Sequence, residues 1–191
     1  APRLMQPSAD TDFEIEAKFD SGVASKYQVQ GILIAGDDND FLRFDFNSNG
    51  NDTRLFVGAF APTGVISETK FIRNDPIRPD EAANDVSPLW MRVKRVGNTW
   101  TPTYSEDGIT FRGPTDSAAS FNFPFNVTHV GVFVGTSGDP GFQPAFTAKV
   151  DYFFNNTAPL DPEDGNAFKS SVNPGGAGTV VTTPPTLAQS V

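Results

Sequence analysis

The segment Leu89–Gly108, LWMRVKRVGNTWTPTYSEDG, predicts a β-hairpin followed by a second tight turn. Its first half alternates apolar residues with Trp, Arg and Lys, a period of two that suits a strand and not a helix. Gly97 and Gly108 each stand beside an Asn or Asp, a pairing typical of residues that adopt the left-handed backbone of hairpin turns. We therefore expect an antiparallel sheet with one apolar face and one face that carries Trp90, Arg92 and Lys94.

Short runs with similar patterning recur along the chain, separated by turns rich in Asn, Asp and Gly. We expect further strands over residues 12–19, 27–35, 41–46, 53–60, 65–72, 109–112, 121–125, 128–134 and 142–154. With 18 Phe, 17 Gly and 16 Pro among 191 residues, the chain has the composition of an all-β protein with a Phe-rich core and many turns. This number of strands suits two antiparallel sheets stacked face to face.

Composition and charge exclude several classes of function. A net charge of -9 argues against nucleic acid or an anionic membrane as partner, because both attract clustered Lys and Arg. The absence of Cys excludes disulfides, thiolate zinc sites and cysteine nucleophiles. The single histidine, His129, lies where an apolar strand begins, and we expect a turn or strand-edge residue there rather than a catalytic base.

The composition changes near residue 156. Residues 1–156 are expected to form the β-sandwich domain, and residues 157–191 a tail or linker rich in Pro, Gly and Thr. Within this tail, Thr179–Thr183 (TVVTT) has the β-propensity to add a strand to a sheet edge of this domain or of a neighbouring chain.

Four segments, in order, resemble a known module: APRLMQPSADTDFEIEAKFDS, YQVQGILIAGDDNDFLRFDF, WMRVKRVGNTWTPTYSEDGITF, and HVGVFVG followed by FTAKVDYF. Over residues 1–154 the chain resembles a concanavalin A-like β-sandwich module of secreted bacterial proteins. It is similar to the accessory domain that follows the catalytic domain in family-43 β-xylosidases.

The resemblance implies a jelly roll of two curved antiparallel sheets and an extracellular or cell-surface, often carbohydrate-active, setting. Catalysis belongs to neighbouring domains in those enzymes, so we expect no enzymatic activity from this domain. Members of the family have a strand or two ahead of the segment that matches Ala1 onward. We therefore expect the front of the sandwich to be missing, cleaved away or supplied by another polypeptide, with the tail as one candidate donor.

A sugar-binding patch is the first candidate site. Such sites place aromatic rings against the apolar face of a pyranose and surround it with planar hydrogen-bonding groups. Alternation places the candidates on shared strand faces in three pairs: Trp90 with Arg92, Trp100 with Tyr104, and Arg43 with Asp45. If these three strands are neighbours, one aromatic and polar patch results; in the alternative interpretation, Trp90 and Trp100 are core or sheet-covering residues.

Calcium is the only cofactor for which the sequence offers ligands, because Asp37, Asp38 and Asp40 form a dense group of carboxylates. The segment does not fit the EF-hand pattern, and residues of this type also dominate tight turns that hold no metal. For glycoside hydrolysis, which needs two carboxylates about 5–10 Å apart, the sequence contains no motif of the sandwich glucanases.

Two functions are left open. The first is a non-catalytic, secreted module that binds a glycan or serves a neighbouring domain of a carbohydrate-active protein. The second is a structural subunit of a surface assembly, which would self-associate through its sheet edge and its tail.

Overall fold

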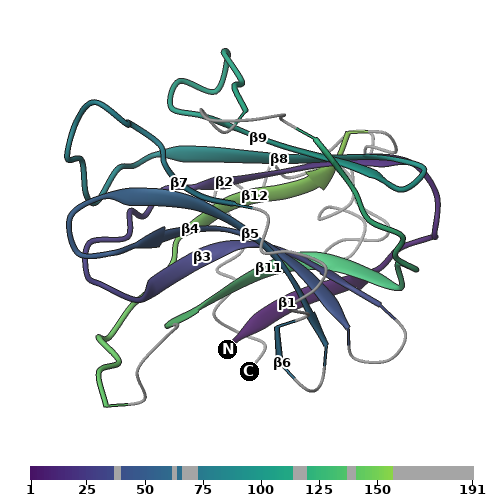
Figure 1. The fold of residues 1–191 in the computed structure, drawn as a ribbon, viewed down its shortest axis with the longest axis horizontal. Coiled ribbons are helices and arrows are strands. Elements are labelled where there is room, and N and C mark those ends of the chain that lie inside the picture. Colours follow the sequence, from purple (N-terminus) through teal and green to yellow (C-terminus); the bar gives the residue numbers. More distant parts are fainter. Residues whose placement is uncertain (37–39, 62–63, 66–72, 114–119, 137–140, 157–191) are drawn as a thin grey trace, which may run out of the picture.

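The computed structural model describes residues 1–36, 40–61, 64–65, 73–113, 120–136 and 141–156. Within these ranges the chain forms strands and no helix, and the strands make two antiparallel sheets packed face to face (Figure 1). The expected all-β sandwich is thus confirmed. The strands are β1 (Arg3–Pro7), β2 (Phe13–Phe19), β3 (Gln28–Ala35), β4 (Phe41–Ser48), β5 (Thr53–Ala61), β6 (Gly64–Val65), β7 (Arg73–Pro76), β8 (Leu89–Val96), β9 (Thr99–Ser105), β10 (Phe121–Asn122), β11 (His129–Thr136) and β12 (Val150–Asn155).

The two sheets differ in size and combine strands that are distant in sequence. The larger has seven strands in the order β1-β11-β3-β4-β5-β6, with β7 also paired to β5. The smaller has five, in the order β10-β9-β8-β2-β12. No helix in the described ranges is long and apolar enough to cross a membrane.

The β8–β9 hairpin forms as the sequence predicts. Its loop has two residues, because Val96 pairs with Thr99 across the turn. Gly97 has a φ of 56° and Gly108, in the following turn, a φ of 73°, so both glycines adopt the left-handed backbone that was expected of them.

Three strand predictions need correction. The first strand is β1 and not residues 12–19; its sequence, RLMQP, lacks clear alternation, and its ladder with β11 forms it. The predicted strand over 142–154 is a strand only from Val150, since residues 142–149 contain a proline and pair with no described strand. Residues 109–112 contribute a single bridge between Arg112 and Tyr104. Most of the predicted strand 65–72, like the predicted tail 157–191, lies outside the described residues.

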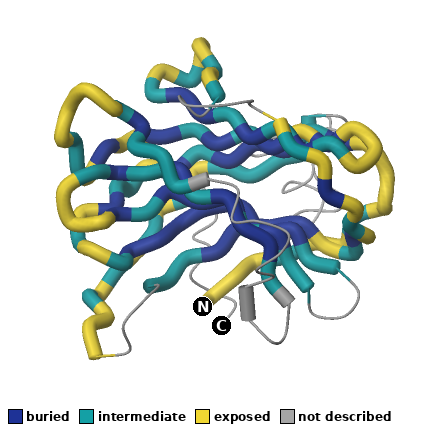
Figure 2. The backbone as a smooth tube through the Cα atoms, viewed as in Figure 1, coloured by how far each residue is buried: buried dark blue, intermediate teal, exposed yellow. Residues whose placement is uncertain are grey.

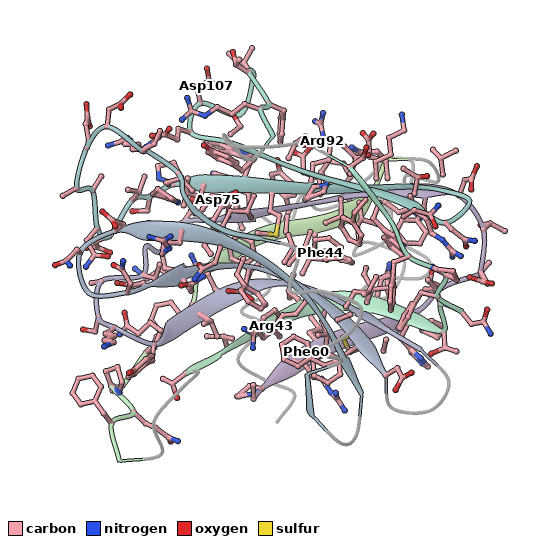
Figure 3. All side chains as sticks on the ribbon, in the orientation of Figure 1. Arg43, Phe44, Phe60, Asp75, Arg92 and Asp107 are labelled. Atoms are coloured by element: carbon pink, nitrogen blue, oxygen red, sulfur yellow. The ribbon has the colours of Figure 1, made fainter. Side chains whose placement is uncertain are left out.

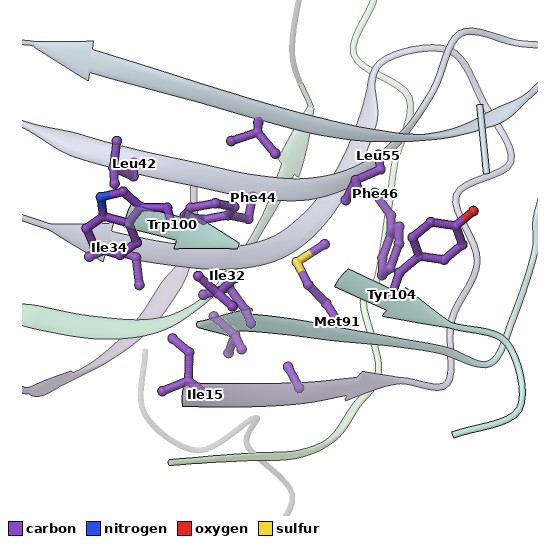
Figure 4. Close-up of a cluster of buried hydrophobic side chains, with 14 of the residues drawn as sticks. Ile15, Ile32, Ile34, Leu42, Phe44, Phe46, Leu55, Met91, Trp100 and Tyr104 are labelled. Atoms are coloured by element: carbon purple, nitrogen blue, oxygen red, sulfur yellow. The ribbon is translucent and has the colours of Figure 1, made fainter. Parts of the chain in front are cut away.

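The core lies between the sheets and follows from the two-residue period of the strands. On β4, Leu42, Phe44 and Phe46 are fully buried between the sheets, while the residues between them point to the outer face. On β8, the inward positions Leu89, Met91 and Val93 face them from the opposite sheet. Figure 4 shows part of this cluster, and Figure 2 shows that burial is concentrated in the central strands and lost at the turns.

Aromatic side chains of β9 hold the core to its flanking loops. The Trp100 ring packs edge-on against Phe13, and its Nε1 donates a 2.9 Å hydrogen bond to the carbonyl of Phe123. The Tyr104 hydroxyl donates a 2.7 Å hydrogen bond to the carbonyl of Ile77. Each polar group thus has the partner that a buried donor needs.

Arg95 closes one end of the core from an inward position on β8. Its guanidinium carbon lies 5.2 Å from the centroid of the Trp100 ring, and Nη2 donates a 2.9 Å hydrogen bond to the carbonyl of Phe125. The same side chain forms an ion pair with Asp10. A hydrogen bond from the Val127 amide, followed by the bond from Arg95, lowers the pKa of Asp10.

The two tryptophans should differ in their effect on stability. We expect Trp100→Ala to lower the free energy of unfolding by about 3–5 kcal/mol, because it leaves a large cavity and an unpaired Phe123 carbonyl. Trp90→Ala should cost less than half as much, since its ring is only half-buried. Urea unfolding of the two variants measures both values, and equal losses would contradict the assignment of Trp100 to the core.

Candidate functional site: the outer faces of the two sheets

The six residues predicted to bind sugar are divided by the fold among three places. Trp90 and Arg92 lie on the outer face of the five-stranded sheet. Arg43 and Asp45 lie on the outer face of the seven-stranded sheet. Trp100 and Tyr104 lie in the core. Figure 3 shows Arg92 and Arg43 on opposite sides of the buried Phe44. No single ligand could contact all six.

The prediction that Trp100 and Tyr104 form sugar-stacking platforms is wrong. Their exposed fractions are 0% and 1%, and both pack inside the sandwich. The signal that places them there is the two-residue loop of the hairpin. It sets Trp100 opposite Arg95 and Tyr104 opposite Met91, so both share the inward face rather than the face of Trp90.

Arg92 lies on the outer face of the five-stranded sheet in a network of satisfied partners. Its Nε and Nη2 donate hydrogen bonds of 2.8 and 2.6 Å to Glu16, and its guanidinium carbon lies 3.7 Å from the ring centroid of Phe111. The Tyr152 hydroxyl donates a 2.7 Å bond to the same carboxylate of Glu16. Burial, followed by this neighbouring carboxylate, raises the pKa of Tyr152. The network ties β12, β2 and β8 together.

Trp90 is half-buried on the same face. The turn at Gly108 lies against its ring, since a Cβ on that glycine would come within 2.9 Å of the Trp90 Cε2 atom. The Lys18 ammonium lies 5.5 Å from the ring centroid on the neighbouring strand. Part of the indole is therefore already covered by the protein's own groups.

The outer face of the seven-stranded sheet carries a different arrangement, centred on Arg43. The guanidinium carbon lies 4.5, 4.9 and 6.0 Å from the ring centroids of Phe56, Phe60 and Phe133. Phe60 also stacks on Phe41 at 4.9 Å. These rings come from β4, β5 and β11, so the sheet pairing brings them together. We call these four phenylalanines with Arg43 and Asp45 the Arg43 face.

Asp45 lies within the Arg43 face and is completely buried, with an exposed fraction of 0%. Arg43 Nε lies 2.6 Å from Asp45 Oδ2 as an ion pair, but the geometry is not that of a hydrogen bond. Neither carboxylate oxygen has a hydrogen-bond partner among the described residues. Burial raises the pKa of Asp45 to about 6, opposed by the positive charge of Arg43 and, more weakly, by the nearby polar groups of Arg43 and Asn47, although neither makes a hydrogen bond of good geometry with the carboxylate.

Glycine on the neighbouring strand makes room for this carboxylate. Gly31 pairs with Asp45, and a Cβ at that position would lie 2.6 Å from the Asp45 Cα. Amide groups border the face on the other side, where Asn47 Nδ2 donates a 3.3 Å hydrogen bond to Asn74 Oδ1. The Arg54 Nε donates a 3.0 Å bond to the Asn74 carbonyl. Polar groups therefore border the aromatic rings on this side of the face.

The predicted calcium ligands receive no structural support. Asp37 and Asp38 lie outside the described residues, and Asp40 is described at the start of the segment that leads into β4. Among the residues that the structure describes, no three His, Cys, Asp or Glu side chains form a group that could hold a metal ion. His129 is exposed at the first position of β11, with Nδ1 3.1 Å from the Thr128 hydroxyl.

Comparison with known proteins identifies the fold and not a family. No family model and no curated protein sequence matches this chain. Solved structures do match. The GH43 protein BlXynB from Bacillus licheniformis aligns with a TM-score of 0.50 and 17% identity over 80% of this chain and 32% of that protein. A CBM2 module of the evolved Dit protein of Lactobacillus casei BL23 phage J-1 aligns with a TM-score of 0.51 and 11% identity, over 76% of this chain and 62% of that chain.

A third match is a tetrameric galectin from the sponge Cinachyrella sp., with a TM-score of 0.48 and 14% identity over 81% of this chain and 99% of that one. The chain spans about a third of the GH43 protein and under two thirds of the phage module. At these identities the first two likenesses establish the fold alone. The concanavalin A-like sandwich expected from the sequence is confirmed.

The stability of the protein should report the ionisation of Asp45. Its pKa is about 6 when folded, above the ordinary value of 3.8, so the folded state binds the proton more tightly. This tighter proton binding contributes fully to the free energy of unfolding below about pH 4, and the contribution is lost as the pH rises through 6. The shift of about two pH units corresponds to about 3 kcal/mol.

We therefore expect the free energy of unfolding of Asp45→Asn, relative to that of the wild type, to increase by up to about 3 kcal/mol as the pH rises from 4 to 7.5, because Asn does not ionise. Urea unfolding of both proteins across this range measures the difference. A difference that stays constant with pH would contradict an Asp45 carboxylate that is buried without hydrogen bonds.

Proposed function

We propose that this chain is a non-catalytic glycan-binding module, and that it binds on the Arg43 face. The observation that carries the proposal is the buried carboxylate of Asp45, which forms an ion pair but no hydrogen bond, next to an arginine surrounded by phenylalanine rings. The proposal includes a secreted protein, in line with the resemblance to modules of secreted bacterial proteins.

The chemistry of the face suits a sugar. Pyranose rings present C–H groups to aromatic surfaces and hydroxyl groups to planar donors and acceptors. Phe41 and Phe60 are half-buried, so each residue keeps some exposed surface on this side of the sheet. Among the described residues, Arg43 interacts with Asp45 and with phenylalanine rings. A guanidinium fork matches two adjacent hydroxyl groups.

The other outer face is less suited to the same task. Arg92 donates hydrogen bonds from Nε and Nη2 to Glu16, and that carboxylate also accepts a hydrogen bond from the Tyr152 hydroxyl. A ligand there would have to displace these existing hydrogen bonds, so the net gain in binding free energy would be small. The same pairing argues against a role for Glu16 as a catalytic acid, which supports the non-catalytic part of the proposal.

The proposal predicts that glycan binding depends on Arg43 and not on Trp90. Charged hydrogen bonds contribute about 1.5–3 kcal/mol, so we expect Arg43→Ala to weaken binding by roughly 10- to 100-fold. Trp90→Ala, on the opposite outer face, is the matched control and should bind as the wild type does. A glycan array followed by calorimetry on the bound glycans makes the comparison.

Loss of binding in Trp90→Ala with retention in Arg43→Ala would move the site to the five-stranded sheet. An array on which the wild type binds no glycan would overturn the proposed function.

A further inference from the structure

The Nε atom of Arg43 and its two terminal nitrogens, Nη1 and Nη2, have different positions relative to Asp45. Its Nε is buried against Asp45, whereas the side chain as a whole keeps 19% of its surface exposed. The fork of Nη1 and Nη2 lies at the far end of the guanidinium, and the interactions of Arg43 with described residues are the ion pair with Asp45 and the contacts with phenylalanine rings. What the fork can bind therefore depends on the charge of the group behind it.

This inference rests on the proposed function of the Arg43 face. We propose that Asp45 selects the class of sugar that Arg43 binds. With Asp45 ionised, the pair is neutral and the fork takes uncharged hydroxyl groups. With Asp45 protonated, Arg43 becomes an unbalanced cation and binds a sugar carboxylate, so the face accepts acidic saccharides containing uronic acids under acidic conditions.

The electrostatic argument follows from the 2.6 Å separation of Nε and Oδ2. A ligand carboxylate at the fork would lie a few ångströms further from Asp45, in surroundings where burial reduces screening by water. Repulsion from an ionised Asp45 would offset much of its attraction to Arg43. Protonation removes the repulsion and leaves a bidentate charged pair between guanidinium and carboxylate, among the strongest contacts available to either group.

The titration range makes this selection accessible. Burial raises the pKa of Asp45 to about 6, so the group is mostly protonated at pH 5 and almost wholly ionised at pH 8. An unperturbed sugar carboxyl group, with a pKa near 4 or below, stays ionised over that range. If only the protonated form binds the acidic sugar, the apparent affinity follows the protonated fraction and falls by about 90-fold from pH 5 to pH 8; residual binding by the ionised form makes the change smaller.

The other ionisable groups of this sheet do not lie opposite Asp45 on the neighbouring strands. The strands next to Asp45 bring Gly31 from β3 and Phe56 from β5, neither of which ionises. Asp75 on β7 pairs with Leu55 and so lies on the inward face of the sheet. Among the described residues, the other ionisable side chains at outward positions of this sheet are Arg3, Arg54 and the exposed His129, and the amino-terminal Ala1 lies against Gly135 on β11.

The test uses the whole chain and matched glycans. Oligosaccharides of galacturonic, glucuronic and mannuronic acid are arrayed beside their neutral methyl esters and neutral glycans, and binding is measured at pH 5 and pH 8. We expect the preference of the wild type for acid over ester to rise by about tenfold or more at pH 5. Asp45→Asn should prefer the acid form at both pH values, because its Arg43 is never neutralised.

Each outcome separates the two proposals. Glycan binding with no change of preference between the pH values would overturn the selection by Asp45 and leave the proposed function standing. A pH-dependent preference that persists in Asp45→Asn would assign it to another group, with His129→Gln as the next variant. Absence of any glycan binding at either pH would overturn both.

A measurement on the wild type makes the test independent of how well the variant folds. The carboxyl resonance of Asp45, followed by carbon-13 NMR through a pH titration, gives its pKa directly. Because linkage is reciprocal, a bound uronic acid oligosaccharide should raise that pKa, and its neutral ester should not. Equal effects of the two glycans would contradict the proposal.

Discussion

The pairing register of β8 and β9 fixes the position of the two largest fully buried side chains among the described residues, Trp100 and Tyr104. A loop of two residues sets Val96 opposite Thr99, and from there Trp100 and Tyr104 must face inward. Through their polar groups these rings bond the carbonyls of Phe123 and Ile77, in segments that enter the core from elsewhere in the chain. A slip of one residue would turn both rings outward and break both hydrogen bonds, so the closure of the sandwich depends on this register.

The faces of each strand could be predicted from sequence, but their assembly could not. Alternation on β4 places Arg43 and Asp45 on one side of their strand, and alternation on β8 does the same for Trp90 and Arg92. Nothing local says that β4 and β8 belong to different sheets, because that is decided by pairings such as β4 with β5. The position of Trp100 was within reach of the sequence, since the two-residue turn already determines its cross-strand partner. The burial of Asp45 was not, because Phe56 and Phe133 come from strands distant in the chain.

The two outer faces show opposite ways of placing an arginine beside a carboxylate. Arg92 and Glu16 make two well-formed hydrogen bonds, and Tyr152 adds a third, so every group on that network has a partner. The arrangement stabilises the edge of the five-stranded sheet, because both oxygens of Glu16 accept hydrogen bonds. Arg43 and Asp45 are as close together, yet the carboxylate oxygens lack hydrogen bonds. The first pair acts within the fold, whereas the second retains capacity for an external partner.

Asp45 costs the folded protein stability that an apolar residue or an asparagine would not, because a buried carboxylate without donors is desolvated and only partly compensated by one cation. Residues that weaken a fold in this way are concentrated at functional sites, where the lost stability accompanies a property that the site needs. Here that property is the orientation and charge of Arg43. The Asp45 carboxylate beside Nε and the phenylalanine rings around the guanidinium restrict the position of Arg43 on this face. We place the proposed binding site on the seven-stranded sheet because a carboxylate that weakens the fold lies there beside Arg43.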